Sequence, residues 1–190
     1  MSDTMEAMSV IYFVTGNEGK FREAKEQLPT LERVEIDLPE EQSLDPQYVI
    51  AKKLETAQRL HDGPLIVEDT SLYLDGLNGF PGPLIKWMMQ SVGNQGIYDL
   101  CQNIHNRRAV AKTVIGYWDG TEVRYFDGAT EGQIVAPYGN EGFGWDDIFQ
   151  PDGLNETFAE MGDEYKPEFS MRTEAFGKLR DYLANELTNK

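Results

Sequence analysis

Cysteine and histidine are scarce in this sequence of 190 residues, which has one cysteine, Cys101, and two histidines, His61 and His105. A lone cysteine forms neither an intrachain disulfide nor a multi-cysteine zinc site, and it indicates a reducing, cytoplasmic location. So few histidines also disfavour a Ser-His-Asp triad and a histidine-ligated zinc ion. Among hydrolytic groups, we therefore expect carboxylates that act with a hard metal ion.

Basic residues and long apolar runs are scarce as well. Lysine and arginine number 17 against 33 acidic residues, which gives a formal net charge of −16. Because this charge repels polyanions, we expect no nucleic-acid partner, and any phosphate ligand needs a local cluster of cations, backbone N–H groups or metal. No stretch reaches the roughly 18 apolar residues of a membrane span. The first residues lack the features of a signal peptide, so we expect no membrane association.

Strand and helix patterns alternate along the first part of the sequence. Residues 10–14 form a continuous apolar run that is typical of a buried strand, and a helical pattern follows over residues 18–28. Residues 34–38 and 65–67 have strand patterns, and between them residues 46–60 predict a helix with proline at its first position. This alternation predicts an α/β fold with parallel strands.

The rest of the sequence adds antiparallel strands to this core. Asp119-Gly120 is a hairpin signal between two strand patterns, and antiparallel strands beside a parallel core predict a mixed sheet. Since neither a repeat nor a linker is visible, we expect residues 1–190 to form a single domain. The expected elements are helices at 84–91, 96–106 and 169–187, and strands at 112–118, 122–126 and 130–135.

The turn after the first strand is a candidate phosphate site. Thr15-Gly16-Asn17 joins this strand to a helix that carries Lys20 on its first turn. Ligands of open α/β sheets bind beyond the carboxyl ends of the strands, and the positive end of a helix favours phosphate there. Many glycine turns of this kind bind no ligand, so a turn with a purely structural role is the alternative.

Two acidic residues that follow predicted strands are candidate metal ligands. Successive strand residues point to opposite faces, so Glu68 and Asp69 cannot easily face one site, and we expect Asp69 to face it. Glu40 follows the neighbouring strand, and the two carboxylates would make a Mg²⁺ site. Asp69 would also accept a proton from the attacking water. The alternative is an acidic strand end that only caps a turn.

Two lysines and an aromatic segment are further candidates for ligand binding. Lys52 and Lys86 could bind phosphate, although a lysine on an amphipathic helix such as that of Lys52 is more often solvated. In Phe143-Gly144-Trp145-Asp146, an aromatic ring could stack on a purine while the carboxylate bonds its edge. A packed aromatic turn is the alternative.

Six ordered motifs make the sequence similar to the inosine triphosphate pyrophosphatase family, whose members are also called XTP/dITP pyrophosphatases. The resemblance extends from Phe13 to about Leu183. The motifs are VTGNEGK at 14–20, DLPE at 37–40, VEDTSL at 67–72, GFPGPLIKW at 79–87, GFGWDDIFQPDG at 142–153 and TFAEM at 157–161.

The resemblance implies an elongated, two-lobed α/β fold with a twisted mixed sheet flanked by helices, an active-site cleft between the lobes, and a homodimer. It implies Mg²⁺-dependent hydrolysis of ITP, dITP and XTP to the monophosphate and pyrophosphate, which cleanses the nucleotide pool. Glu40 and Asp69 would hold the metal, and Asp69 and Lys20 would be catalytic. The implied substrate-binding residues are Thr15, Gly16, Asn17, Lys20, Lys52, Thr70, Lys86, Phe143, Gly144, Trp145, Asp146, Lys166, Met171 and Arg172.

Two positions depart from the family's usual pattern. Met171 stands where the family usually has histidine, and Pro167 follows Lys166 where the family has asparagine. By the resemblance, Arg172 donates to the 6-oxo group of the base and so favours hypoxanthine over adenine. We therefore expect weaker selectivity for ITP over GTP than the family usually shows. The alternative functions are a pyrophosphatase of other modified nucleotides and a catalytically inactive nucleotide-binding module.

Overall fold

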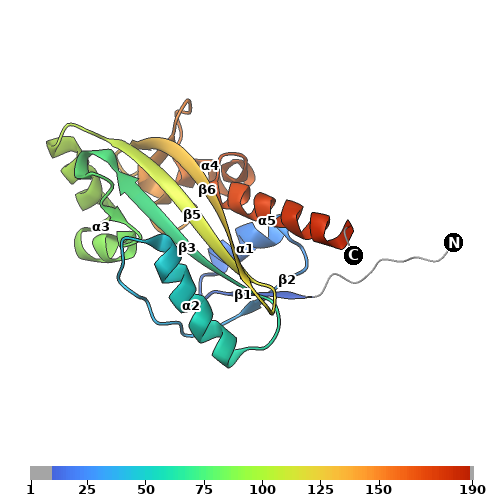
Figure 1. Ribbon diagram of the computed structural model, residues 1–190. Helices are drawn as coiled ribbons and strands as arrows, with labels where there is room; N and C mark the ends of the chain where they lie inside the picture. The colour runs from blue at the N-terminus through green and yellow to red at the C-terminus, as the bar shows by residue number, and fades with distance from the viewer. Residues whose placement is uncertain (1–9, 189–190) are drawn as a thin grey trace.

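The computed structural model describes residues 10–188, which form one sheet with helices packed around it (Figure 1). Within these residues, no helix combines the length and the apolar character needed to cross a membrane. In chain order the strands and α-helices are β1 (Ile11–Val14), α1 (Glu18–Gln27), β2 (Leu31–Val34), α2 (Pro46–Leu60), β3 (Leu65–Leu74), β4 (Pro81–Gly82), α3 (Ile85–Asn103), β5 (Arg108–Trp118), β6 (Val123–Ile134), β7 (Phe149–Pro151), α4 (Phe158–Tyr165) and α5 (Met171–Thr188). Short 3-10 turns are η1 (Asp75–Leu77), η2 (Asp146–Ile148) and η3 (Lys166–Glu168).

The sheet is mixed, as the sequence predicted. Its strand order is β2-β1-β3-β5-β6-β7, and β4 pairs with β3 outside this path. β1 lies parallel to β2 and β3, whereas β3, β5, β6 and β7 pair antiparallel. The long strands β3, β5 and β6 run side by side through the centre of the molecule (Figure 1).

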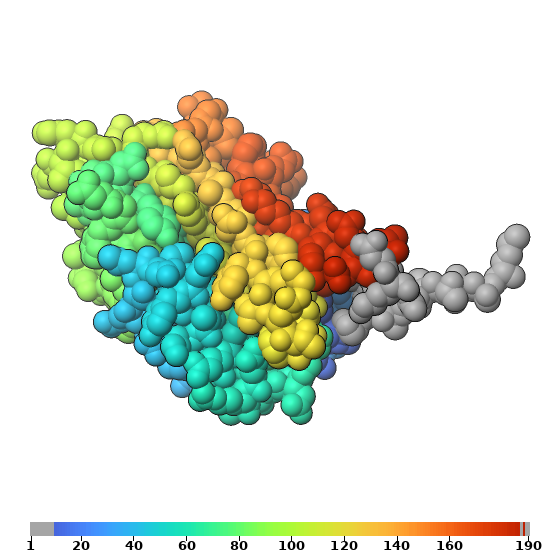
Figure 2. Space-filling model, in the orientation of Figure 1, coloured from blue at the N-terminus to red at the C-terminus, as the bar shows by residue number. Residues whose placement is uncertain are grey.

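Helices cover both faces of the sheet because apolar residues of β3 alternate. Leu65 and Val67 pack with Ile50 and Leu54 of α2 on one face. Ile66 packs on the other face, in a core formed with α1 and α5. Across the face shown in Figure 2, α2, the turn between β5 and β6 (yellow) and α5 (red) follow one another. A third core, at the far end of β3 and β5, joins α3, α4 and β7.

Several strand boundaries differ from the sequence prediction because pairing and packing override local pattern. The strand predicted at 65–67 continues to Leu74, since β5 pairs with β3 over its full length. The strands predicted at 122–126 and 130–135 are one strand, β6. Gly128 lies inside it, where a Cβ would come within 2.0 Å of the Met171 carbonyl oxygen, so this glycine allows α5 to approach the sheet. The strand predicted at 34–38 was misplaced, since β2 spans Leu31–Val34, and the strand predicted at 112–118 begins earlier, at Arg108.

The two helices predicted at 84–91 and 96–106 are one element, α3, with an interruption. Gly93 has φ 68° and ψ 174°, which no residue of a regular helix adopts. The prediction of two helical segments was therefore close, and the break falls at a glycine that tolerates this backbone conformation.

Candidate active site

A cavity of about 460 Å³ opens where the β1–α1 turn, β3, the start of α3, the loop after β6 and the start of α5 converge. A smaller cavity of about 100 Å³ adjoins it and is lined by Asp69, Glu40 and Lys20, among others. The polar elements that were expected to converge are therefore brought together. The predicted residues that line the larger cavity are Thr15, Gly16, Asn17, Lys20, Glu40, Thr70, Lys86, Phe143, Gly144, Trp145, Asp146, Met171 and Arg172.

Side-chain caps shape the β1–α1 turn. Asn17 is the N-cap of α1, and its Oδ1 accepts a hydrogen bond from the Lys20 backbone N–H at 3.0 Å. The Thr15 hydroxyl oxygen accepts one from the Asn17 N–H at 3.1 Å. A Cβ on Gly16 would meet no heavy atom within 4 Å, so open space lies beside the backbone here. This turn exposes the positive end of α1 to the cavity, an arrangement that favours an anion.

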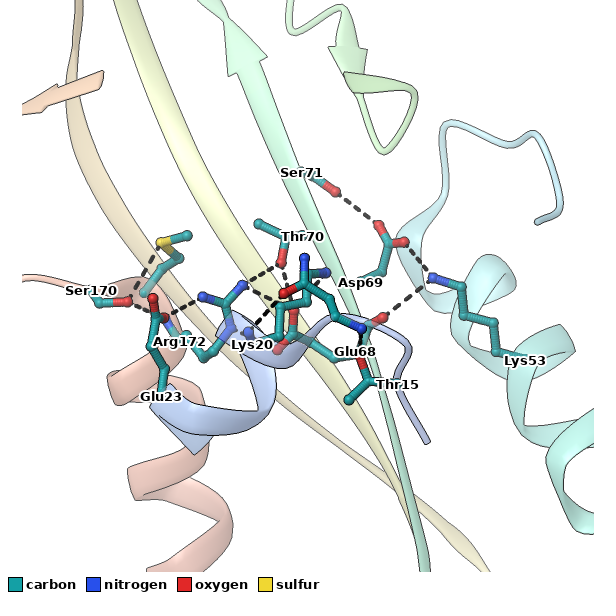
Figure 3. A network of polar contacts seen from close by, with 12 residues as sticks. Thr15, Lys20, Glu23, Lys53, Glu68, Asp69, Thr70, Ser71, Ser170 and Arg172 are labelled. Carbon is teal, nitrogen blue, oxygen red and sulfur yellow. Dashed lines mark hydrogen bonds and ion pairs between the residues drawn. The ribbon is translucent and has the colours of Figure 1, made fainter. Parts of the chain in front are cut away.

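Glu68 and Asp69 point to opposite sides of β3, as Figure 3 shows, yet both reach the site. Glu68 lines the larger cavity and forms an ion pair with Lys20 at 2.9 Å, whereas Asp69 lines the smaller one. The expectation that only one of these acids could face the site was wrong. β1 pairs with β3 only as far as Ile66, and β4 pairs from Leu72 onward, so neither covers this edge of β3 between them.

The lysine of α2 that reaches the site is Lys53, and the prediction of Lys52 was wrong in this respect. Lys53 Nζ lies 2.9 Å from Asp69 Oδ1, and Lys53 lines both cavities. Lys52 lines neither and pairs with Glu55 at the surface. Helix phase explains the difference: Lys53 follows the buried Val49 by four residues, which places it on the face toward the sheet.

Glu40 reaches the site from an irregular segment instead of a strand end. β2 ends six residues earlier, at Val34, and β1 lies between β2 and β3. The prediction that Glu40 and Asp69 lie on adjoining strands was therefore wrong. Glu40 nevertheless lines both cavities and pairs with Lys86 at 2.6 Å. We call the part of the site formed by Lys20, Lys53 and Lys86 the lysine end.

A buried chain of ion pairs connects the lysine end to the rest of the site, and its central residue, Glu23, was not predicted. Glu23 accepts hydrogen bonds from Arg172 and, at 2.9 Å, from Lys166 Nζ. Arg172 also pairs with Glu68 at 2.8 Å, on the far side of the guanidinium (Figure 3). Glu23 follows Lys20 by three residues on α1, and this shared helix face was the available signal.

The cations in this series of buried ion pairs keep two of its carboxylates ionised. Burial opposes the charged form of Glu68, but the Arg172 and Lys20 cations hold its pKa well below the usual range. Burial likewise opposes ionisation of Glu23, and Arg172 and Lys166 together lower its pKa. At Asp146, burial outweighs the nearby Lys166, and the pKa is raised.

Arg172 lines the cavity as the resemblance implied, but Lys166 does not. Arg172 donates from Nε to Glu68, from Nη1 to Glu23, and from Nη2 to Glu68 and Thr70. Of its five N–H groups, one on Nη1 thus has no acceptor within residues 10–188. Lys166 is 2% exposed and lies behind the cavity wall, where it pairs with Asp146 at 2.7 Å. Lys166 therefore contacts residues that belong to the site but does not line the cavity itself.

A second part of the cavity wall, which we call the aromatic end, is formed by Phe143, Trp145 and Met171. The Phe143 ring centroid lies 4.6 Å from Lys166 Nζ. Trp145 is largely buried and packs against Phe149, with ring centroids 5.4 Å apart. Met171 is 2% exposed and belongs to the same core, so its side chain gives this end an apolar wall.

The fold and the site together define an α/β protein whose cavity joins a cation-rich end to an aromatic end. Residues 11–182 match the sequence model described as the Ham1 family. The chain belongs to this family, and the resemblance noted from its motifs is thereby confirmed.

Named relatives and solved structures agree with this assignment. The inosine triphosphate pyrophosphatase of Schizosaccharomyces pombe is 40% identical over 96% of this chain and 99% of its own length. The dITP/XTP pyrophosphatase of Methanopyrus kandleri is 38% identical over 95% of this chain and 99% of its own. The solved Ham1 protein of Staphylococcus aureus shares the fold with a TM-score of 0.76 and 26% identity, over 93% of this chain and 98% of that one.

Proposed function

We propose that this protein is a Mg²⁺-dependent pyrophosphatase that hydrolyses non-standard purine nucleoside triphosphates, namely ITP, dITP and XTP, to the monophosphate and pyrophosphate. The observation that carries the proposal is one continuous site with a lysine end and an aromatic end. A triphosphate suits the first and a purine suits the second. The names of the relatives in Schizosaccharomyces pombe and Methanopyrus kandleri support this choice of substrate.

Glu40 and Asp69 fit a magnesium site. Both carboxylates line the smaller cavity, and Mg²⁺ is commonly held by one or two carboxylates together with substrate phosphates. No group of three or more potential ligating side chains occurs within residues 10–188, which suits an ion that phosphate helps to hold. When bound, the ion would neutralise phosphate charge. Lys86 and Lys53, which now pair with these acids, would then be free to donate to phosphate oxygens.

The lysine end supplies the groups that hydrolysis needs. The N–H groups of the β1–α1 turn and Lys20 would bind the phosphate chain. The Thr70 hydroxyl, which donates to Glu68 Oε1 at 2.6 Å in this structure, would turn to donate to phosphate from β3. Asp69 would accept a proton from the water that attacks the α-phosphorus. In this arrangement pyrophosphate leaves while Lys20 and its neighbours stabilise the negative charge that develops on it.

The aromatic end would select the base. Phe143 would stack on the purine, and Asp146 would accept a hydrogen bond from its edge. Arg172 retains one N–H for the 6-oxo group, and an adenine 6-amino group would present it with a second donor. Leaving that buried N–H unpaired disfavours adenine by about 1–3 kcal/mol. Because Met171 adds no polar group to this wall, we propose that discrimination between ITP and GTP is weak.

Product analysis tests the proposed reaction. The protein is incubated with ITP and Mg²⁺, and the products are separated and quantified. We expect equal amounts of IMP and pyrophosphate, and no pyrophosphate when Mg²⁺ is chelated. Formation of IDP and orthophosphate would contradict cleavage at the α-phosphorus.

A substrate panel separates the proposed reaction from hydrolysis of other modified nucleotides. ITP and XTP should have higher kcat/KM than dUTP, and the reverse order would favour the alternative. Binding of ITP without turnover would indicate a catalytically inactive module. A homodimer is also proposed, on the resemblance alone, and a cytoplasmic location is proposed on the scarcity of cysteine.

A further inference from the structure

One side chain of α3 holds the loop that forms the aromatic end. The side-chain amide nitrogen of Asn94 donates to the Gly144 carbonyl oxygen at 2.8 Å and to Asp147 Oδ1 at 2.5 Å. Both N–H groups of one amide are thereby used on acceptors of the same loop. Asn94 itself lines neither cavity, so its contact with the site runs through the loop.

The interruption of α3 immediately precedes this side chain. Gly93 has φ 68°, and a Cβ there would meet no heavy atom within 4 Å. The glycine is therefore required by backbone conformation and not by lack of space. Because the helix restarts at this point, the direction of the Asn94 side chain differs from the direction it would have in a regular, uninterrupted helix.

Packing restrains Gly144 less than its neighbours, because Trp145 is buried in the core and the Phe143 ring lies against Gly19 of α1, whereas a Cβ on Gly144 would meet no heavy atom within 4 Å. Gly144 is exposed and has φ 69°, a conformation that glycine adopts and leaves easily. Within the loop, Asp146 Oδ2 accepts from the Phe143 N–H at 2.8 Å, which orders one side of Gly144. The bond from Asn94 to the Gly144 carbonyl fixes the other side and anchors the segment between Phe143 and Trp145 to a different element of the fold.

We propose that Asn94 is a positioning residue for base recognition, because it holds the loop from Phe143 to Asp147 in the position at which Phe143 and Trp145 line the cavity. This inference rests on the proposed function, since it assigns the base of the nucleotide to the aromatic end. Asn94 forms hydrogen bonds with this loop and none with Lys20, Lys53 or Lys86, so its loss should weaken ligands that carry a base more than ligands that do not.

Kinetics of Asn94→Ala test the proposal. Loss of two hydrogen bonds should raise the KM for ITP about fivefold to thirtyfold, while kcat stays within about twofold of the wild type. Inorganic pyrophosphate has no base, so its inhibition constant should not change. The matched control is Gln95→Ala on the same helix. Within residues 10–188 the Gln95 amide bonds only to Asp99, at 2.8 Å, and this variant should change neither constant.

An exchange of the two side chains between positions 94 and 147 adds a second test. Asn94→Asp keeps the shape but sets a carboxylate against Asp147 and the Gly144 carbonyl, so the KM for ITP should rise at least as much as in Asn94→Ala. Adding Asp147→Asn restores a donor between the two side chains and should recover part of the loss. An unchanged KM in Asn94→Ala, or equal weakening of ITP and pyrophosphate, would overturn the inference while leaving the proposed function intact. Absence of ITP hydrolysis by the wild type would overturn both.

Discussion

Glu23→Gln removes the negative charge that lies between two buried cations. Arg172 and Lys166 are 1% and 2% exposed, and Glu23 contacts both of them. Removing one partner of a buried ion pair destabilises a protein by about 3–5 kcal/mol, because the remaining charge is left uncompensated. Here Arg172 keeps Glu68 and Lys166 keeps Asp146. We therefore expect the lower limit, a decrease of about 3 kcal/mol in the free energy of unfolding.

Urea denaturation of Glu23→Gln beside Glu26→Gln measures this decrease. Glu26 lies on the same helix and is exposed, so the control makes the same chemical change and the same change in net charge. It should alter the free energy of unfolding by no more than about 0.5 kcal/mol. If the two variants unfold at the same urea concentration, the buried chain of ion pairs does not stabilise the fold as argued.

Three further expectations concern the lysine end, acid stability and the base. Lys53→Ala should lower kcat/KM for ITP about a hundredfold, whereas Lys52→Ala should leave it within about twofold; equal effects of the two would refute the assignment of Lys53. The pKa of Glu68 is held below its ordinary 4.5, so below pH 4.5 the unfolded chain binds more protons and stability falls as the pH falls. Urea midpoints measured from about pH 6 downward should show this loss of stability, and the midpoint of Glu68→Gln should depend less on pH. Met171→His should raise the ratio of kcat/KM for ITP to that for GTP, and an unchanged ratio would count against a role of this position in base selection.

Local sequence predicts the part of the site whose residues are neighbours in the sequence. A strand, a glycine turn and a helix with an asparagine cap are neighbours in sequence, so Thr15 to Lys20 could be placed without knowledge of the fold. Asp69 was found because an acidic pair follows a buried apolar run. That this pair lies inside a strand depends on β5, which pairs with β3 along its whole length from a distant part of the chain.

The residues that sequence reasoning missed owe their position to long-range packing. Glu23 resembles a solvated acid on a surface helix until α5 brings Arg172 over it. Lys53 differs from Lys52 by one residue, and only the phase of α2 against the sheet separates them. Asn94 follows a break in α3, and its partners lie 50 and 53 residues further along the chain. Separations of this size leave no periodic pattern in the sequence.

Turnover of ITP by Asp69→Asn tests the central assignment most directly. The substitution keeps the size of the side chain but removes its charge and its ability to accept a proton. Asp75→Asn, an exposed position just after the same strand, serves as the control. We expect kcat to fall about a hundredfold to ten-thousandfold in Asp69→Asn and to stay at the wild-type value in the control. Turnover of Asp69→Asn at the wild-type rate would contradict the assignment of the lysine end as the site of hydrolysis.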